Sequence, residues 1–302
     1  MSQVRKTLAV VGAGLVGTAF ARLLAVRGYE VTGVWSRSRQ GVERSERAGF
    51  KVFGDAAAAA AEAEVVLVTV RDDAVHLIAR EIAEGGAVRA GQVYLHTSGS
   101  QGVDALAPLA SAGALVGAIH PLQTFAAVDA AIELLPGSYF GVTAEGPALE
   151  AVEAIVSALG GTSLMIPESE RVTYHLSAVL ASNCFVALVE LASLVLVAVG
   201  VPEREAQAAL LPLVAGTLRN IESLGIEAAL TGPVARGDAA TVAGHARVLA
   251  RLDPRVAEAY ASLSDVALDL ARARGLGPEI AGELAAVLAG VRANAAERGA
   301  GA

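Results

Sequence analysis

The first half of the chain alternates short apolar runs with stretches of helical periodicity. Several of these runs are apolar at consecutive positions, as strands buried on both faces are. Strands that alternate with helices predict a parallel sheet with helices on its faces. The predicted strands are Thr7–Val11, Glu30–Trp35, Val65–Val70, Val93–His96, Ala114–Ile119, Tyr139–Val142 and Ser163–Met165. The predicted helices between them include Gly17–Arg27, Val75–Glu84 and Gly102–Ser111, with a short surface helix in Asp55–Glu64.

Beyond Pro167 the pattern contains only helical periodicity. It is interrupted at Gly200–Pro202, Gly225, Thr231–Asp238, Asp253–Pro254 and Gly275–Pro278. The intervening segments carry leucine and alanine on more than one face, which requires burial, often against a partner chain. The sequence therefore predicts an α/β protein. A Rossmann-type doubly wound sheet in residues 1–167 is followed by an all-α domain in residues 168–302, through which we expect a homodimer.

One segment of the helical half, Leu176–Val199, is long and apolar enough to cross a bilayer. Asn183 and Glu190 lie inside it, and a glutamate near a membrane centre is costly. We therefore expect a buried core helix and no membrane contact. The alternative is a protein anchored to a membrane by this segment.

Composition narrows the class further. The chain has 302 residues, 54% of them hydrophobic, and a formal net charge of −8. This charge argues against nucleic acid as a partner, because no basic face neutralises phosphates. Cys184 is the only cysteine, which fits a reducing cytoplasm. The only lysines are Lys6 and Lys51.

A glycine-rich motif follows the first predicted strand and opens the first helix. It runs Gly12, Ala13, Gly14, Leu15, Val16, Gly17. The first glycine makes the tight turn, the second admits a pyrophosphate, and the third allows close helix–strand packing. The helix N-terminus then faces the phosphates. This context predicts a dinucleotide site.

The end of the second strand predicts which dinucleotide binds. An NAD site places an acid there to accept from the ribose hydroxyls. This chain has Ser36, Arg37, Ser38 and Arg39 instead, which offer two guanidinium groups and two hydroxyls to a phosphate. We therefore expect NADP(H), with Val70 at the end of the third strand also in the cofactor site; the alternative is a solvated basic loop.

Four polar clusters stand out in the apolar chain. Two follow neighbouring strands and should lie at the edge of the sheet where ligands bind. The clusters are His96-Thr97-Ser98-Gly99, His120-Pro121-Leu122-Gln123-Thr124, Tyr174-His175 with Ser182-Asn183, and Thr231–Asp238 with Thr241 and His245. Each also has a structural explanation: a histidine that bonds a carbonyl, Asp238 as a helix N-cap, or Asn183 as a contact between helices. No H-x-x-x-H spacing is present, so we expect no metal.

The motifs Gly12-Ala13-Gly14, His96-Thr97-Ser98-Gly99, His120-Pro121-Leu122-Gln123, Ser182-Asn183 and Thr231–His245 together resemble one family. Its members join a Rossmann-like NADP-binding domain to a helical C-terminal domain of unknown function. The resemblance covers essentially the whole chain and implies the architecture of the 6-phosphogluconate dehydrogenase-like superfamily. Some members resemble a second type of ketopantoate reductase, which implies a ketopantoate-like substrate.

One departure from the related enzymes concerns the proton donor. β-Hydroxyacid dehydrogenases use a helix lysine followed by an asparagine. Asn183 matches that asparagine, but Val179 stands where the lysine would be. Histidine titrates near neutral pH and can replace it, so His175 is the first candidate and His120 the second. The segment from His96 to Thr124 also partly resembles prephenate dehydrogenases, in which Ser98 and His120 would contact the substrate.

The sequence thus predicts an NADP(H)-dependent oxidoreductase that acts on a small carbonyl or imine compound, with a carboxylate as the expected substrate class. The expected catalytic residues are His175, His120, Asn183 and Ser98, and the expected substrate-binding residues are Gln123, Arg236, His96 and His245. The alternatives are an NADP(H)-binding sensor without turnover and a prephenate dehydrogenase-like enzyme.

Overall fold

A computed structural model describes residues 6–299 of the chain. It contains two compact units, Met1–Ser182 and Asn183–Ala302. The predicted boundary after Pro167 precedes the helix α8 (Arg171–Ala181), whereas the units divide after Ser182. This helix therefore belongs with the sheet, and its side chains join the polar residues at the sheet's edge.

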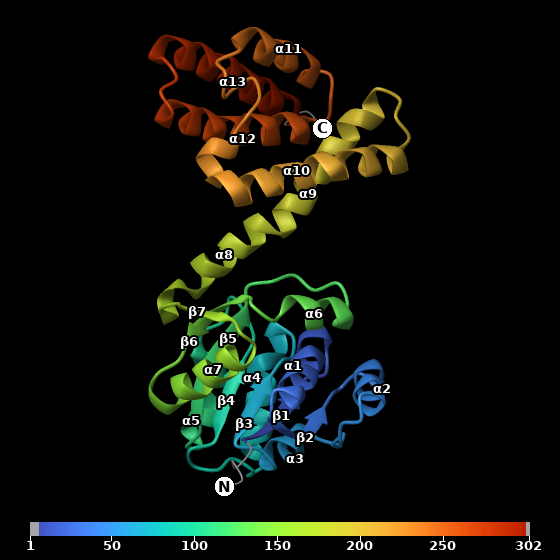
Figure 1. The fold of residues 1–302 in the computed structure, drawn as a ribbon, viewed down its shortest axis with the longest axis vertical. Coiled ribbons are helices and arrows are strands. Elements are labelled where there is room, and N and C mark those ends of the chain that lie inside the picture. Colours follow the sequence, from blue (N-terminus) through green and yellow to red (C-terminus); the bar gives the residue numbers. More distant parts are fainter. Residues whose placement is uncertain (1–5, 300–302) are drawn as a thin grey trace. The chain divides into compact units, whose positions relative to one another are not determined.

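The first unit is built on a seven-stranded sheet with the order β2-β1-β3-β4-β5-β6-β7 (Figure 1). The strands are β1 (Thr7–Val11), β2 (Glu30–Trp35), β3 (Val65–Val68), β4 (Val93–His96), β5 (Leu115–Pro121), β6 (Tyr139–Thr143) and β7 (Thr162–Met165). All neighbouring pairs are parallel except β5 and β6. The predicted doubly wound sheet is therefore confirmed, except that β6 and β7 run opposite to the other strands, because apolar periodicity carries no information on strand direction.

Helices cover both faces of this sheet, as the doubly wound prediction requires. Alternate residues of each strand point to opposite faces, so Leu8 and Val10 pack in one core and Ala9 and Val11 in the other. The first core includes α1 (Leu15–Val26), α6 (Val128–Leu134) and α7 (Gly146–Ala158). The second includes α3 (Ala56–Ala61), α4 (Asp72–Glu84), η1 (Val103–Leu106) and α5 (Ala107–Ser111). The remaining helices of this unit are α2 (Arg39–Arg47), η2 (Glu168–Glu170) and α8.

The second unit is helical throughout its described residues, which confirms the fold class. Its helices are α9 (Asn183–Ala198), α10 (Glu203–Ala229), α11 (Ala239–Leu249), α12 (Pro254–Ala273) and α13 (Pro278–Gly299). Every predicted interruption falls between helices except Gly225, which kinks α10 with φ 79° and ψ 168°. Asp238 caps α11, since its carboxylate accepts the Thr241 amide at 3.0 Å.

The apolar segment Leu176–Val199 is largely exposed, although the sequence predicted a buried helix. The helical stretch Glu168–Ala198 is long and apolar enough to cross a membrane by length and composition alone, with a mean hydropathy of 2.1. Only 6% of its most apolar window is buried. The prediction of a buried core helix is therefore wrong for the single chain. Leu180, Val186 and Val199 are among its exposed side chains.

Candidate functional site

The glycine-rich loop lies at the carboxyl ends of β1, β2 and β3, where the strand order reverses. Ligands of open α/β sheets bind at this switch point. A hollow of about 350 Å³ opens there, which we call the cofactor hollow. Its lining residues are Gly12, Ala13, Gly14, Trp35, Ser36, Arg37, Ser38, Thr69, Val70, Arg71 and Ile78.

Backbone and side-chain hydrogen bonds from three other elements hold this loop. Gly12 donates its amide to the Trp35 carbonyl at 2.8 Å, and the Thr69 hydroxyl donates to the Gly12 carbonyl at 2.6 Å. The Arg44 guanidinium donates to the Ala13 carbonyl at 3.0 Å. Gly12 has φ +112°, and a Cβ there would lie 2.7 Å from the Thr69 backbone. Only glycine therefore fits this turn without strain.

The two arginines at the end of β2 face different surroundings. Arg37 lines the cofactor hollow with Ser36 and Ser38, whereas Arg39 does not. Arg39 instead pairs with Glu43 on the exposed side of α2 at 2.8 Å. Ser38 accepts the Gly41 amide at 3.1 Å and caps α2. The geometry favours Arg37 over Arg39 as a phosphate ligand.

Of the other residues expected at the cofactor, Leu15, Val16 and Gly17 form the start of α1 behind the loop. Gly17 packs so closely that a Cβ would overlap the Gly12 carbonyl. Thr69, which sequence reasoning missed, and Arg71, which the sequence places at the carboxyl end of the third strand, lie at the hollow because they follow β3. Their place at a strand's carboxyl end was the available signal.

Polar residues gather at the neighbouring ends of β4 and β5. His96 is fully buried and both of its ring nitrogens are engaged. Its Nε2 lies 2.9 Å from the Gly102 carbonyl, and its Nδ1 accepts the Ser98 amide at 3.2 Å. These partners assign the proton to Nε2. The geometry gives His96 a role in holding the Ser98 loop, where the sequence suggested a substrate contact.

His120, at the end of β5, meets Tyr174 and His175 of α8. The Nδ1 of His120 lies 2.8 Å from the Tyr174 hydroxyl. The rings of His120 and His175 meet edge to face with centroids 6.1 Å apart. We call His120, Tyr174 and His175, together with Ser98, the polar cluster.

Two glycines make room for the polar cluster. A Cβ on Gly99 would lie 2.8 Å from Nε2 of His120 and 2.6 Å from Cδ2 of His175. Gly141 lies opposite His120 in the β5–β6 register, and a Cβ there would overlap the Tyr174 ring. The absence of a side chain at Gly99, in the loop after β4, and at Gly141, in the middle of β6, therefore allows the three rings to meet.

Arg171, at the start of α8, is buried next to the polar cluster. Sequence reasoning did not identify it as a site residue. Its side chain is only 1% exposed, the largest of the fully buried ones. It donates to the Ser98 carbonyl and, at 3.1 Å, to the Thr143 hydroxyl. Its Nε has no hydrogen-bond partner among residues 6–299, and no carboxylate lies within 4.0 Å of its guanidinium there. Arg171 thus brings a buried positive charge to the site, which the carboxylates of Glu168 and Asp72 offset only from beyond 4.0 Å.

Burial and the charge of Arg171 determine the protonation states of the polar cluster and of the neighbouring His96. Burial, followed by the charge of Arg171, lowers the pKa of His96 to about 4. The same two causes lower the pKa of His120 to about 4. Burial raises the pKa of Tyr174. Near neutral pH the site therefore holds neutral imidazoles at His96 and His120 and a protonated phenol.

The other expected site residues lie apart from these contacts. Gln123 is exposed in the loop after β5 and accepts the Thr124 amide at 2.9 Å. Asn183, Arg236 and His245 belong to the second unit, where all three are exposed. His245 pairs there with the Tyr260 hydroxyl at 3.0 Å. The proposed roles of these four residues stay predictions.

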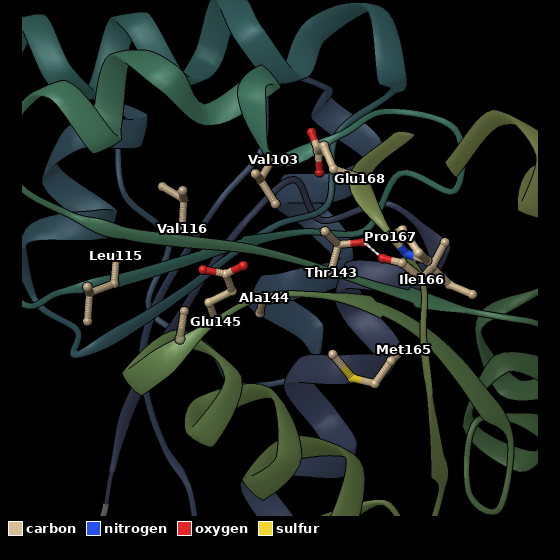
Figure 2. Close-up of a pocket in the computed structure, with 11 residues that line it drawn as sticks. Val103, Leu115, Val116, Thr143, Ala144, Glu145, Met165, Ile166, Pro167 and Glu168 are labelled. Carbon is tan, nitrogen blue, oxygen red and sulfur yellow. Dashed lines mark hydrogen bonds between the residues drawn. The ribbon is translucent and has the colours of Figure 1, made fainter. Parts of the chain in front are cut away.

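A larger cavity of about 560 Å³ lies beside the amino-terminal half of β5 (Figure 2). Leu115 and Val116 line it with Met165, and the carboxylates of Glu145 and Glu168 border it. No histidine, cysteine or serine side chain lines this cavity. No group of three or more His, Cys, Asp or Glu side chains in the described part of the chain is placed to hold a metal ion. The cofactor hollow and the polar cluster are therefore the better candidates for chemistry.

Two family models match the chain, and their boundary lies earlier than the boundary between the two compact units, which follows Ser182. Residues 1–121 match the model of a Rossmann-like domain, and residues 138–267 match that of a domain of unknown function (DUF2520). No curated protein matches the chain significantly.

Solved structures share the fold. A protein from Bacteroides fragilis, provisionally assigned as an NADP oxidoreductase, is 25% identical with a TM-score of 0.70, covering 88% of this chain and 98% of its own. A protein from Thermotoga maritima is 26% identical with a TM-score of 0.69, covering 88% and 99%. An imine reductase from Streptomyces aurantiacus, 21% identical with a TM-score of 0.58 and covering 72% and 74%, shares the fold alone. The chain therefore joins a region that is similar to Rossmann-like domains to a region that is similar to DUF2520 domains.

Proposed function

We propose that the protein is an NADP(H)-dependent oxidoreductase that transfers hydride to or from a small carbonyl or imine compound. The observation that carries the proposal is the placement of two features along one edge of the sheet. The cofactor hollow follows β1 to β3, and the polar cluster follows β4 and β5. The assignment of the Bacteroides fragilis relative as an NADP oxidoreductase supports it.

The hollow fits a dinucleotide phosphate. A Cβ built on Gly14 meets nothing within 4 Å, so the backbone there is open to a pyrophosphate. The N-terminus of α1 follows directly and favours negative charge. No acid lines the hollow, while Arg37 and two serine hydroxyls do. These groups suit a ribose 2′-phosphate better than two free hydroxyls.

When bound, NADPH supplies the hydride. The residues of the chain bind the phosphates at the hollow, position the substrate carbonyl near the polar cluster, and supply a proton to its oxygen. His175 and His120 are the two candidate donors, because both are partly exposed and both lie beside Gly99. We propose that Arg236 and Asn183 hold a substrate carboxylate, with Gln123 and His245 as further polar contacts.

NADPH oxidation by the full chain, measured with a panel of acceptors, tests this function. The panel contains small 2-oxo acids including ketopantoate, and cyclic imines including pyrroline-5-carboxylate, with prephenate and NADP⁺ for the reverse direction. We expect turnover with at least one carboxylated acceptor. Tight NADPH binding without turnover on the whole panel would contradict the proposal and favour a sensor.

Replacement of His175 distinguishes a catalytic role of this residue from a structural one. We expect His175→Ala to lower kcat by about 10²- to 10⁴-fold when His175 donates the proton, the usual contribution of a general acid, and by less when it only packs against the His120 ring. Its Kd for NADPH should stay close to that of the native protein. His76→Ala, at an exposed histidine of α4, is the matched control and should change neither quantity. Equal losses of kcat and NADPH affinity in His175→Ala would make His175 structural.

We also propose that the helical domain forms a homodimer. Its helices α9 and α10 expose large apolar side chains, which are Val186, Leu188, Val197, Leu211, Leu213, Leu218, Ile221, Leu224 and Ile226. Exposed apolar surface of this extent marks an interaction site. Light scattering coupled to size-exclusion chromatography should give twice the chain mass, and Leu213→Glu should give a monomer. A monomeric native protein would contradict this proposal.

A further inference from the structure

The two ring nitrogens of His120 face different surroundings. Nδ1 lies 2.8 Å from the Tyr174 hydroxyl. Nε2 faces Gly99, whose backbone packs so closely that a Cβ there would come within 2.8 Å of this nitrogen, and the His120 side chain as a whole is partly exposed. A proton that enters at Nδ1 can therefore leave at Nε2, on the opposite edge of the ring, beside Gly99 and His175.

We propose that Tyr174 and His120 form a proton relay in which the phenol protonates Nδ1 as Nε2 protonates the substrate. This inference rests on the proposed reductase function and names the donor system of that site. Tyr174 is the source of the proton, His120 carries it, and Arg171 positions both.

The relay follows from the charge state of the cluster. His120 is neutral near pH 7, because burial and the charge of Arg171 lower its pKa to about 4. A neutral imidazole is a poor acid unless it gains a proton at one nitrogen while it loses one at the other. Tyr174, whose pKa burial raises, keeps its proton and can donate it to Nδ1. This direction requires the Nε2–H tautomer of His120.

Arg171 provides the charge that the relay needs. Its guanidinium carbon lies 5.9 Å from the centre of the Tyr174 ring. Within residues 6–299 it forms no ion pair; Glu168 and Asp72 act on it from farther away, and its charge also acts on the Tyr174 phenol, whose pKa it lowers against the larger effect of burial. A buried charge acts strongly because little solvent screens it. Arg171 touches no reacting atom and is a positioning residue.

The step balances in atoms and electrons. The carbonyl carbon gains the hydride from the reduced nicotinamide, and the C=O π pair moves to oxygen. That oxygen takes the proton of Nε2, and Nδ1 takes the proton of the Tyr174 hydroxyl. Solvent returns a proton to the phenolate, so each turnover consumes one hydride and one proton.

Titratable groups from three elements face His120. They are Arg171, Tyr174 and His175 of α8, His96 of β4 and Asp72 of α4. Asp72 opposes the effect of the cations, but burial and Arg171 outweigh it.

Nitrogen-15 NMR of the full chain without cofactor tests the relay independently of turnover. We expect His120, assigned with a His120→Asn variant, to carry its proton on Nε2 near pH 7. Tyr174→Phe should shift the Nδ1 resonance, because it loses its donor. Tyr139→Phe, at a half-exposed tyrosine of β6, should leave it unchanged. A His120 protonated on Nδ1, or an Nδ1 signal unmoved by Tyr174→Phe, would overturn the relay.

The pH dependence of the reduction provides the second readout. A relay fed by a phenol should hold kcat level from about pH 6 to 9, whereas an imidazolium donor of ordinary pKa, about 6.5, loses rate above that pH. Tyr174→Phe should lower kcat on the order of 100-fold and make it fall about tenfold per pH unit, with the NADPH Kd unchanged. Native-like rates and a level profile in Tyr174→Phe would refute the relay while the reductase function stands. If no acceptor is reduced by the native chain, the proposed function fails and the relay fails with it, whereas an NMR result against the Nε2–H tautomer overturns the relay alone.

Discussion

The two arginines after β2 allow the cofactor assignment to be tested at single-residue resolution. Arg37→Ala removes the guanidinium that lines the cofactor hollow, and Arg39→Ala removes one that pairs with Glu43 on the surface. The two changes are chemically identical and lie two residues apart. We expect only the first to affect NADPH.

The size of the effect follows from the exposure of Arg37. A hydrogen bond to a charged group contributes about 1.5–3 kcal/mol. Arg37 is exposed, so solvent and salt screen its charge, and about 1–2 kcal/mol is a better value. At about 1.4 kcal/mol per tenfold change, Arg37→Ala should weaken NADPH binding about 5- to 30-fold. NADH lacks the 2′-phosphate, so its affinity should be the same for the native protein and for Arg37→Ala. The Arg39 side chain is 93% exposed, so Arg39→Ala should change either affinity less than about twofold.

Calorimetric titration of each protein with NADPH and with NADH measures the four affinities. Titrations at low and moderate salt add a control, because the contribution of Arg37 should shrink as ionic strength rises. Equal losses in Arg37→Ala and Arg39→Ala would refute the assignment of roles. A loss of NADH affinity as large as that of NADPH would show that Arg37 holds the loop and not the phosphate.

Three further changes test other parts of the structure. Gly141→Ala should displace Tyr174 and reproduce the pH profile of Tyr174→Phe in the kinetic assay, whereas a native profile would show that the ring has room to move. Buried His96 has a folded pKa of about 4, below the ordinary value of about 6.5, so the unfolded state binds more protons between these values. The contribution of His96 to the free energy of unfolding should therefore be complete above about pH 6.5 and be lost toward pH 4, by at most about 1.4 kcal/mol per pH unit. Urea titrations at several pH values measure this. An equally steep dependence on pH in a His96→Gln variant would contradict it. Gly12→Ala should lower both the melting temperature and NADPH affinity, because its φ of +112° strains any side chain, and an unchanged melting curve would refute the strain.

Much of the fold could be predicted from the sequence because its strands are buried on both faces. The predicted bounds of β1, β2 and β4 agree with the structure, since continuous apolar runs end where turn residues begin. The reversed direction of β6 could not be predicted, because a strand's pattern is the same read in either direction. The exposure of the α9 side chains was missed for a related reason. An apolar pattern indicates that a helix is to be buried, but it does not indicate whether the same chain or a partner buries it.

The residues of the candidate site that follow strands could be predicted from the sequence, whereas the buried Arg171 could not. His120 and Ser98 were found because polar residues follow apolar strands. Arg171 was missed because an arginine at the start of a helix is usually solvated, and its burial depends on Ser98 and Thr143, which are distant in the chain. Likewise, nothing in the motif at the end of β2 separates Arg37 from Arg39, since the turn into α2 directs one inward and the other outward.

The hydrogen bonds around the glycine-rich loop also have a kinetic consequence. The Gly12 amide, the Gly12 carbonyl and the Ala13 carbonyl all have partners within the chain before any ligand arrives. Little conformational entropy is then lost on association, because the loop is already ordered. Cofactor binding should therefore proceed in one fast phase without a slow rearrangement, and the Gly12 amide should be protected from hydrogen exchange in the free protein.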